Sequence, residues 1–304
     1  MKDVLSNVRL DFSEDSLLFL NLSLAFIMFG VALGIETKNF RELVRNPKSV
    51  ATGVFSQFIV LPALTFLLVW FLRPVQGLAL GMILVAACPG GNVSNFFSAL
   101  SKGNVALSIT LTAIATVLAT FMTPLNFELW SNLYLGDKLT VEVKMEAFKM
   151  VKMVFFLLVV PLVAGILFTR KFPVFSKKIS LPLRIISFII LIGFIVVAFL
   201  KNMELFTKYY HYIIWLVLLH NALALASGYA ISKLFGNAEQ DNRTISIETG
   251  IQNSGLGLVI IFTLFQGNGG MALITAWWGI WHIVAGIFIS LVYSRGTIFQ
   301  VQTQ

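Results

Sequence analysis

Long hydrophobic runs, separated by short polar stretches, recur from one end of this sequence to the other. Each run has about 20 residues, the length that a helix needs to cross the hydrocarbon core of a bilayer. The runs lie at residues 16–35, 50–72, 76–100, 105–125, 152–169, 181–200, 209–232, 244–265 and 272–293. The pattern predicts an all-α polytopic membrane protein with about nine transmembrane helices.

Two of these runs are interrupted in the middle by helix-breaking residues. Pro89, Gly90 and Gly91 interrupt the third run, and Gly250 interrupts the eighth. Proline removes a backbone donor and glycine has low helical propensity. For either run alone, a simple kink is an adequate interpretation. If spans one to four and six to nine are inverted repeats, however, both breaks fall third in their unit. Paired interruptions of this kind indicate the central binding site of a transporter, built on two discontinuous crossing helices.

The eighth run carries an acidic residue, Glu248, beside its break. A charge in hydrocarbon costs several kcal/mol, so an intramembrane carboxylate is a functional-site hypothesis. Gln252 and the backbone carbonyls of Thr249 and Ile251, which unwinding would free, add oxygen ligands of the kind that a hard cation prefers. The alternative is an interfacial acid that faces water, because Glu248 follows Arg243 by five residues, about 7–8 Å at helical rise.

The half-helices that follow the two breaks predict an anion site. Asn92 and Ser94 follow the first break, and Asn253 and Ser254 follow the second. Such residues cap helix N-termini, where free N–H groups and the helix dipole favour an anion. For Asn92, Asn253 and Ser254, N-capping and substrate contact both remain open. A cation near the carboxylate and an anion at the helix ends together predict coupled symport.

Composition and charge support the membrane assignment. Of 304 residues, 58% are hydrophobic and 12% are charged, and the mean hydropathy is +0.87. The net charge of +8 arises mainly in alternate loops, because the odd-numbered loops and the C-terminal tail hold 13 Lys and Arg against 9 elsewhere. The positive-inside rule predicts a multi-pass protein of the cell membrane with its N-terminus outside and its C-terminus in the cytoplasm. The basic excess therefore reflects topology, and no nucleic-acid partner is expected.

The remaining reactive side chains are too dispersed for catalysis. Cys88 is the only cysteine, and His211, His220 and His282 fall in different runs or at their edges. Such a lone histidine is best explained by a hydrogen bond to a neighbouring helix, so the histidines receive no role. An intramembrane enzyme would need a nucleophile–base pair or a metal cluster. A proton-coupled antiporter of related crossed-helix architecture is the stronger alternative, because Glu248 could titrate. Such antiporters usually place aspartates in the broken helices, and no Asp lies in any predicted span.

The motifs CPGGNVSN, KGNVALSITLT and ETGIQNSGLG resemble the bile acid:sodium symporter family, and the resemblance covers essentially the whole chain. It implies a secondary active transporter, not an enzyme, that couples Na⁺ to an organic anion by alternating access. The anion would be a bile acid or a smaller carboxylate such as pantoate. The resemblance also implies one membrane transport domain over residues 1–304, divided into a panel (about 16–35 and 152–200) and a core (about 50–125 and 209–293).

The resemblance further implies two Na⁺ sites beside the crossing of the broken helices. The ligands implied for the first ion are Ser94, Asn95, Ser108, Thr112 and Glu248. Those implied for the second are Gln57, Glu248 and Gln252, with the carbonyls of Thr249 and Ile251. All of these side chains are present here. The position after the double glycine is Asn92, where some relatives have threonine, so the substrate is expected to meet a different hydrogen-bonding group.

Overall fold

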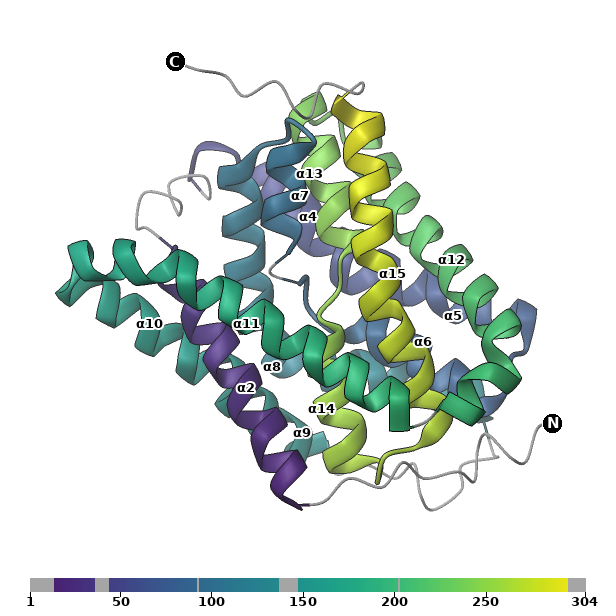
Figure 1. The fold of residues 1–304 in the computed structure, drawn as a ribbon. Helices are drawn as coiled ribbons and strands as arrows, with labels where there is room; N and C mark the ends of the chain where they lie inside the picture. Colours follow the sequence, from purple (N-terminus) through teal and green to yellow (C-terminus); the bar gives the residue numbers. More distant parts are fainter. Residues whose placement is uncertain (1–13, 36–43, 92, 137–146, 202, 295–304) are drawn as a thin grey trace.

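The computed structural model describes residues 14–35, 44–91, 93–136, 147–201 and 203–294, and these are almost entirely helical (Figure 1). In chain order the elements are α2 (Glu14–Ala32), α4 (Pro47–Phe55), the π-helical turn η2 (Ser56–Val60), α5 (Leu61–Leu72), α6 (Gln76–Ala87), α7 (Ser94–Leu100), α8 (Val105–Leu135), α9 (Ala147–Val154), the π-helical turn η5 (Phe155–Val159), α10 (Val160–Lys171), α11 (Pro173–Lys201), α12 (Met203–Leu234), α13 (Glu239–Gly250), α14 (Ser254–Leu264) and α15 (Gly269–Ser294).

Each hydrophobic run of the sequence coincides with one helix or with consecutive helices. Among the described residues, five helical segments are long and apolar enough to cross a membrane: Pro47–Leu72, Val105–Leu135, Ala147–Lys171, Tyr210–Leu234 and Gly269–Ser294. The third and eighth runs are each divided into two shorter helices, α6 with α7 and α13 with α14. The prediction of an all-α polytopic membrane protein with two discontinuous helices is confirmed.

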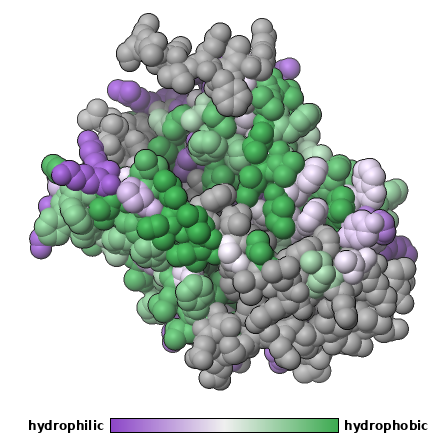
Figure 2. All heavy atoms as spheres, in the orientation of Figure 1, coloured by the Kyte–Doolittle hydropathy of each residue, from purple (hydrophilic) through white to green (hydrophobic). Residues whose placement is uncertain are grey.

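The outer surface is apolar, as expected for contact with lipid. Leu18 and Leu22 of α2 and Phe288 of α15 are more than half exposed, and hydrophobic side chains cover these helices in Figure 2. Hydrophilic side chains gather where α10 meets α11 (Figure 2). Lys171 and Lys177 are exposed there. This distribution suits a helical bundle with polar ends at the membrane surfaces.

The broken helices lie in the middle of the bundle (Figure 1). On one side, α2 packs against α10 and α11. On the other side, α12 runs along α13, and α15 packs against both α6 and α14. Every residue of α6 from Gly77 to Ala87 is buried. The interior therefore surrounds the two breaks with protein, which unwound backbone at membrane depth requires.

The fourth membrane helix is longer than the sequence pattern indicates. The predicted run ends at residue 125, just after Pro124, whereas α8 continues to Leu135. Tertiary contacts explain the continuation: Asn126 Nδ2 donates to the Phe58 carbonyl at 3.1 Å, and the Phe127 ring packs on Phe265 with centroids 5.2 Å apart. Packing against neighbouring helices thus overrides the proline.

The eighth segment also begins earlier than predicted. Helix α13 starts at Glu239 rather than at residue 244, and it includes Asp241, which is buried. The expectation that no aspartate lies in a broken helix is therefore wrong. The Asp241 carboxylate accepts hydrogen bonds from Ser49 Oγ at 2.6 Å and from Asn104 Nδ2 at 2.9 Å. These bonds stabilise a carboxylate that hydropathy alone would assign to a loop.

Candidate functional site

The two breaks are joined by backbone hydrogen bonds. The Gly91 N–H donates to the Ile251 carbonyl at 2.6 Å, and the Asn253 N–H donates to the Pro89 carbonyl at 2.9 Å. A Cβ atom added at Gly91 would lie 3.0 Å from the Gln252 carbonyl oxygen, so this close approach favours glycine. The predicted unwinding at Pro89–Gly91 and after Gly250 is confirmed.

Neighbouring helices satisfy the last carbonyl of each broken half-helix. Thr123 Oγ1 of α8 donates to the Ala87 carbonyl at the end of α6, at 2.8 Å. Asn221 Nδ2 of α12 donates to the Gly250 carbonyl at the end of α13, at 2.7 Å. Helix termini leave carbonyls without intrahelical partners, and burial makes that costly. Neither capping residue stands out in the sequence, because both lie in otherwise unremarkable apolar runs.

Glu248 is buried and surrounded by hydroxyl groups. Its side chain is 1% exposed, so it is not a water-facing interfacial acid. Ser94 Oγ of α7 donates to Oε1 at 2.6 Å, and Ser108 Oγ of α8 donates to the same oxygen. Thr112 Oγ1 lies 3.3 Å from Oε1 and 3.2 Å from Oε2. Three helices thus bring four residues of the predicted first ion site together.

Asn95 completes this oxygen cluster. Its Oδ1 lies 2.8 Å from Ser108 Oγ and 3.4 Å from Thr112 Oγ1. A hydroxyl has a single hydrogen, so Ser108 can donate to Asn95 or to Glu248 but not fully to both. Within the described ranges Glu248 forms no salt bridge. The ion pair of its own helix, α13, joins Arg243 and Glu239 instead. The cluster is rich in oxygen and lacks a positive charge, which is the chemistry of a cation site.

Glu248 and Gln57, two of the ligands predicted for the second ion, both lie beside Gly90. A Cβ atom added at Gly90 would lie 2.9 Å from Glu248 Oε2 and 3.3 Å from Gln57 Nε2. In the part of the chain that the structure describes, Gln57 Nε2 and Gln252 Oε1 are buried without hydrogen-bond partners. Buried polar atoms are normally satisfied, so these two amides mark a place where a polar guest would fit.

Two details of the second group differ from the prediction. Gln252 does not share a helical turn with Glu248, because α13 already ends at Gly250. The carbonyls of Thr249 and Ile251 are not free either: the first accepts from Gln252 Nε2 at 2.7 Å, and the second from the Gly91 N–H. The donor to Thr249 comes from the same segment, whereas the donor to Ile251 comes from the crossing segment, which single-helix reasoning could not include.

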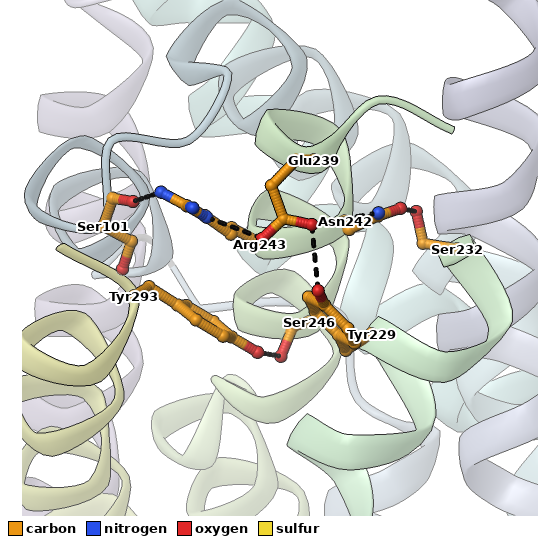
Figure 3. A network of polar contacts seen from close by, with 8 residues as sticks. All are labelled: Ser101, Tyr229, Ser232, Glu239, Asn242, Arg243, Ser246 and Tyr293. Atoms are coloured by element: carbon orange, nitrogen blue, oxygen red, sulfur yellow. Dashed lines mark hydrogen bonds and ion pairs between the residues drawn. The ribbon is translucent and has the colours of Figure 1, made fainter. Parts of the chain in front are cut away.

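A polar network fixes the far end of α13 against its neighbours. Figure 3 shows its members: Ser101, Tyr229, Ser232, Glu239, Asn242, Arg243, Ser246 and Tyr293. Arg243 donates to Glu239 Oε1 at 3.0 Å and to the Ser101 carbonyl at 3.2 Å. Tyr229 OH donates to Glu239 Oε2 at 2.9 Å. This network holds the start of the helix that carries Glu248, and Asn221 holds its end at Gly250.

A cavity of about 650 Å³ reaches the crossing from the side of α2 and α11. Its walls are mainly Leu, Ile, Val and Phe side chains from these two helices and from α7, α8 and α15. Its polar lining residues are Asn95, Thr112, Gln252, Asn253, Ser254 and His282. The cavity therefore fits a molecule with an apolar body and one polar end.

The predicted substrate-binding residues, and Ser94 beside them, differ in their positions and contacts. Asn253 is the N-cap of α14, where its Oδ1 accepts from the Leu256 N–H at 3.0 Å. Ser254 begins α14 and lines the cavity. Ser94 does not cap α7, because the N-cap position is Val93 and the Ser94 hydroxyl instead donates to Glu248. Asn92 lies outside the described residues.

The histidines differ from one another. His220 Nε2 lies 2.7 Å from Thr65 Oγ1, so it bonds a neighbouring helix as expected. His282 of α15 lines the cavity, is 5% exposed, and has no partner for Nδ1 in the described structure. The sequence does not mark His282 as a cavity residue, because a single polar position in an apolar run does not reveal which side of the helix faces a cavity.

Comparisons with known proteins agree with these features. The model of the Sodium Bile acid symporter family matches residues 21–209. The "Uncharacterized sodium-dependent transporter YocS" of Bacillus subtilis is 31% identical over 277 residues, which are 91% of this chain and 83% of that protein. The "Probable sodium/metabolite cotransporter BASS2, chloroplastic" of rice is 36% identical over 246 residues, 79% of this chain and 55% of that protein.

The similarity extends to animals. The "P3 protein" of Bos taurus is 31% identical over 254 residues, 82% of this chain and 52% of that protein. The chain thus spans about half the length of these plant and animal relatives. The family model and the names of the bacterial and rice relatives describe transporters, and the structure has several helices long enough to span a membrane. The chain therefore belongs to the sodium bile acid symporter family and is a multi-pass membrane transporter rather than an enzyme.

Proposed function

We propose that this protein is a Na⁺-coupled symporter that moves an organic anion across the membrane by alternating access. The observation that carries the proposal is the buried Glu248 carboxylate, surrounded by oxygen atoms of Ser94, Ser108 and Thr112 and without a basic partner in the described residues. A buried carboxylate is stabilised by a cation or by protonation, and the surrounding oxygen atoms favour a cation. The names of the bacterial and plant relatives, which refer to sodium, support Na⁺ as that cation.

Two Na⁺ sites on either side of Glu248 account for the polar atoms at the crossing. The first uses Ser94, Asn95, Ser108 and Thr112, and the second uses Gln57 and Gln252 with the carbonyls of Thr249 and Ile251. A single carboxylate with neutral oxygens suits monovalent Na⁺, whereas Ca²⁺ usually attracts several carboxylates. The buried Gln252 Oε1, which has no hydrogen-bond partner in the described structure, supports the second site.

The cavity supports an amphipathic anion as cargo, either a bile acid or a smaller carboxylate such as pantoate. No Lys or Arg is among the described residues that line it, so the anionic group would rely on neutral donors. The N-terminus of α14 at Asn253–Ser254 and the His282 imidazole provide such donors at the polar end. The apolar walls from α2 and α11 would cover the body of the cargo.

Shared residues provide the coupling between ions and cargo. Asn95 and Thr112 of the first ion group and Gln252 of the second also line the cavity. An ion that orders these side chains changes the surface that the anion meets, and the reverse holds by thermodynamic linkage. We assign α2, α10 and α11 to a panel and the remaining helices around the crossing to a core, with the cavity between them. The cytoplasmic side carries the α10–α11 turn and the C-terminus.

Uptake into proteoliposomes tests the proposal directly. At fixed pH, an inward Na⁺ gradient should drive accumulation of a radiolabelled carboxylate, and an equal K⁺ gradient should not. Accumulation that follows a proton gradient and ignores Na⁺ would contradict symport and favour the antiporter alternative. Absence of accumulation for both bile salts and small carboxylates under every gradient would contradict the assigned cargo class.

Single substitutions should separate the two ion sites. Thr112→Ala removes an oxygen from the first site, and Gln57→Ala removes one from the second. Each loss should cost about 1–2 kcal/mol, or roughly tenfold in apparent Na⁺ affinity. Thr116→Ala is the matched control, because its buried hydroxyl bonds only the Thr112 carbonyl of its own helix, at 2.7 Å. Na⁺ titrations of uptake that coincide for all three variants and the parent would argue against the two sites.

The binding affinity of the cargo should depend more on its negative charge than on its apolar shape. A neutral amide analogue keeps the apolar contacts but loses the attraction to the α14 N-terminus, so it should bind about tenfold or more weakly than the acid. Na⁺ should tighten acid binding, and the acid should tighten Na⁺ binding by the same factor. Calorimetric titrations with and without Na⁺ measure both effects. Equal affinities for acid and amide would leave the anion site unsupported.

A further inference from the structure

One π-helical turn, η2 (Ser56–Val60), interrupts the helix formed by α4 and α5 just before Pro62. The Leu61 N–H donates to the Ser56 carbonyl, five residues back rather than four. Pro62 has no N–H, and its ring pushes away the carbonyl of Phe58, which lies four residues before it. The proline thus explains why the helix takes up an extra residue at this place.

Asn126 of α8 satisfies the carbonyl that the proline releases. Its Nδ2 donates to the Phe58 carbonyl at 3.1 Å and to the Met122 carbonyl at 3.0 Å. Its Oδ1 accepts from Trp130 Nε1 at 3.1 Å. Both Phe58 and Asn126 are buried. The π-helical turn η2 is therefore held by Asn126 of a neighbouring helix as well as by Pro62 of its own helix.

The π-helical turn η2 directs two consecutive side chains toward the broken helix α13. Ser56 Oγ lies 2.9 Å from Thr249 Oγ1, and the Gln57 amide lies beside Glu248 in front of Gly90. Gln57 is 1% exposed, so its direction depends on the backbone that carries it. An α-helical register here would rotate everything on one side of the turn by about 100° relative to the other side.

We propose that Pro62 and Asn126 are positioning residues for the second cation, because they hold the π-helical turn that directs Gln57 toward Glu248. This inference rests on the two-ion function proposed above. Neither residue contacts the ion; each acts through the backbone of η2. Their removal should therefore change Na⁺ affinity in the same way as removal of the Gln57 amide.

The chain contains a matched control for the proline. A second π-helical turn, η5 (Phe155–Val159), precedes Pro161, and its Val160 N–H likewise donates five residues back, to Phe155. This turn carries none of the proposed ion ligands. Pro161→Ala thus removes the same kind of constraint from another membrane helix without touching the crossing.

The test compares Na⁺ titrations of uptake and of Na⁺-induced thermal stabilisation in the full-length protein. Pro62→Ala supplies an N–H for the Phe58 carbonyl and permits the α-helical register. It should raise the half-saturating Na⁺ concentration by about three- to tenfold, similar to Gln57→Ala. The double variant Pro62→Ala/Gln57→Ala should have the same half-saturating Na⁺ concentration as Gln57→Ala alone, because the two residues act as a unit. The Na⁺ titration of Pro161→Ala should coincide with that of the parent protein.

Other results distinguish the positioning role of Pro62 and Asn126 from the second ion site itself. A shift for Gln57→Ala without one for Pro62→Ala overturns the positioning role and leaves the second ion site intact. No shift for Gln57→Ala overturns both. Equal shifts for Pro62→Ala and Pro161→Ala indicate general helix loosening and also overturn the role. If Pro62→Ala does not fold, Asn126→Leu tests the same turn, because it leaves the Phe58 carbonyl without its donor and should also weaken Na⁺ binding.

Discussion

Glu248→Gln should abolish the stimulation of uptake by Na⁺ while leaving the protein folded. Glutamine keeps the size of the side chain and one oxygen for the Ser94 and Ser108 hydroxyls, but it removes the charge shared by both proposed sites. Loss of a buried charged partner costs about 3–5 kcal/mol, which corresponds to at least about 100-fold in apparent Na⁺ affinity. Uptake at saturating Na⁺ and Na⁺-dependent thermal stabilisation should both disappear.

Asp241→Asn is the control for this substitution. Asp241 is the other buried acid of α13, but it is held by Ser49 and Asn104 near the start of the helix. Its amide variant should lose some thermal stability and keep the parent's Na⁺ dependence. A folded Glu248→Gln protein with unchanged Na⁺ dependence would refute the two-site assignment, whatever the control shows.

A methyl group at Gly90 should have an effect nearly as large. The Cβ atom of Gly90→Ala would lie 2.9 Å from Glu248 Oε2 and 3.3 Å from Gln57 Nε2. Because both contacts are ends of flexible side chains, the protein should fold while the carboxylate moves away from the second site. We expect a loss of about tenfold or more in Na⁺ affinity, since at least one charge-assisted contact is lost.

Gly257→Ala distinguishes this effect from simple crowding. Its Cβ atom would lie 3.0 Å from a methyl group of Thr275, between α14 and α15. It should therefore perturb packing without changing half-saturating Na⁺. The role of Gly90 would be disproved by isothermal Na⁺ titrations in which Gly90→Ala behaves like Gly257→Ala.

The sequence could predict the features that depend on composition along a single helix. Hydrophobic runs located the membrane helices, and Pro89–Gly91 and Gly250 located the breaks. Residue type also indicated an N-cap at Asn253 or Ser254, and the structure shows Asn253 in that role. These are local properties: burial in lipid, backbone propensity and a side chain that bonds its own helix terminus.

Features that depend on which helices meet could not be predicted in the same way. Ser94 has the residue type of an N-cap, yet it bonds Glu248 because α13 lies opposite it. The Asp241 carboxylate is satisfied inside the bundle by Ser49 of α4 and by Asn104, the N-cap of α8. His282 becomes a cavity residue only through the packing of α15. Each of these outcomes is decided by tertiary contacts that no single segment contains.

The pairing of the two breaks through backbone atoms has an evolutionary consequence. Gly91 N–H to Ile251 O and Asn253 N–H to Pro89 O are main-chain bonds, so they persist when most side chains around them are exchanged. Mutations in the cavity wall can then accumulate without loss of the crossing that holds the ion ligands together. Substitutions that alter the cavity wall therefore leave the main-chain pairing of the two breaks in place.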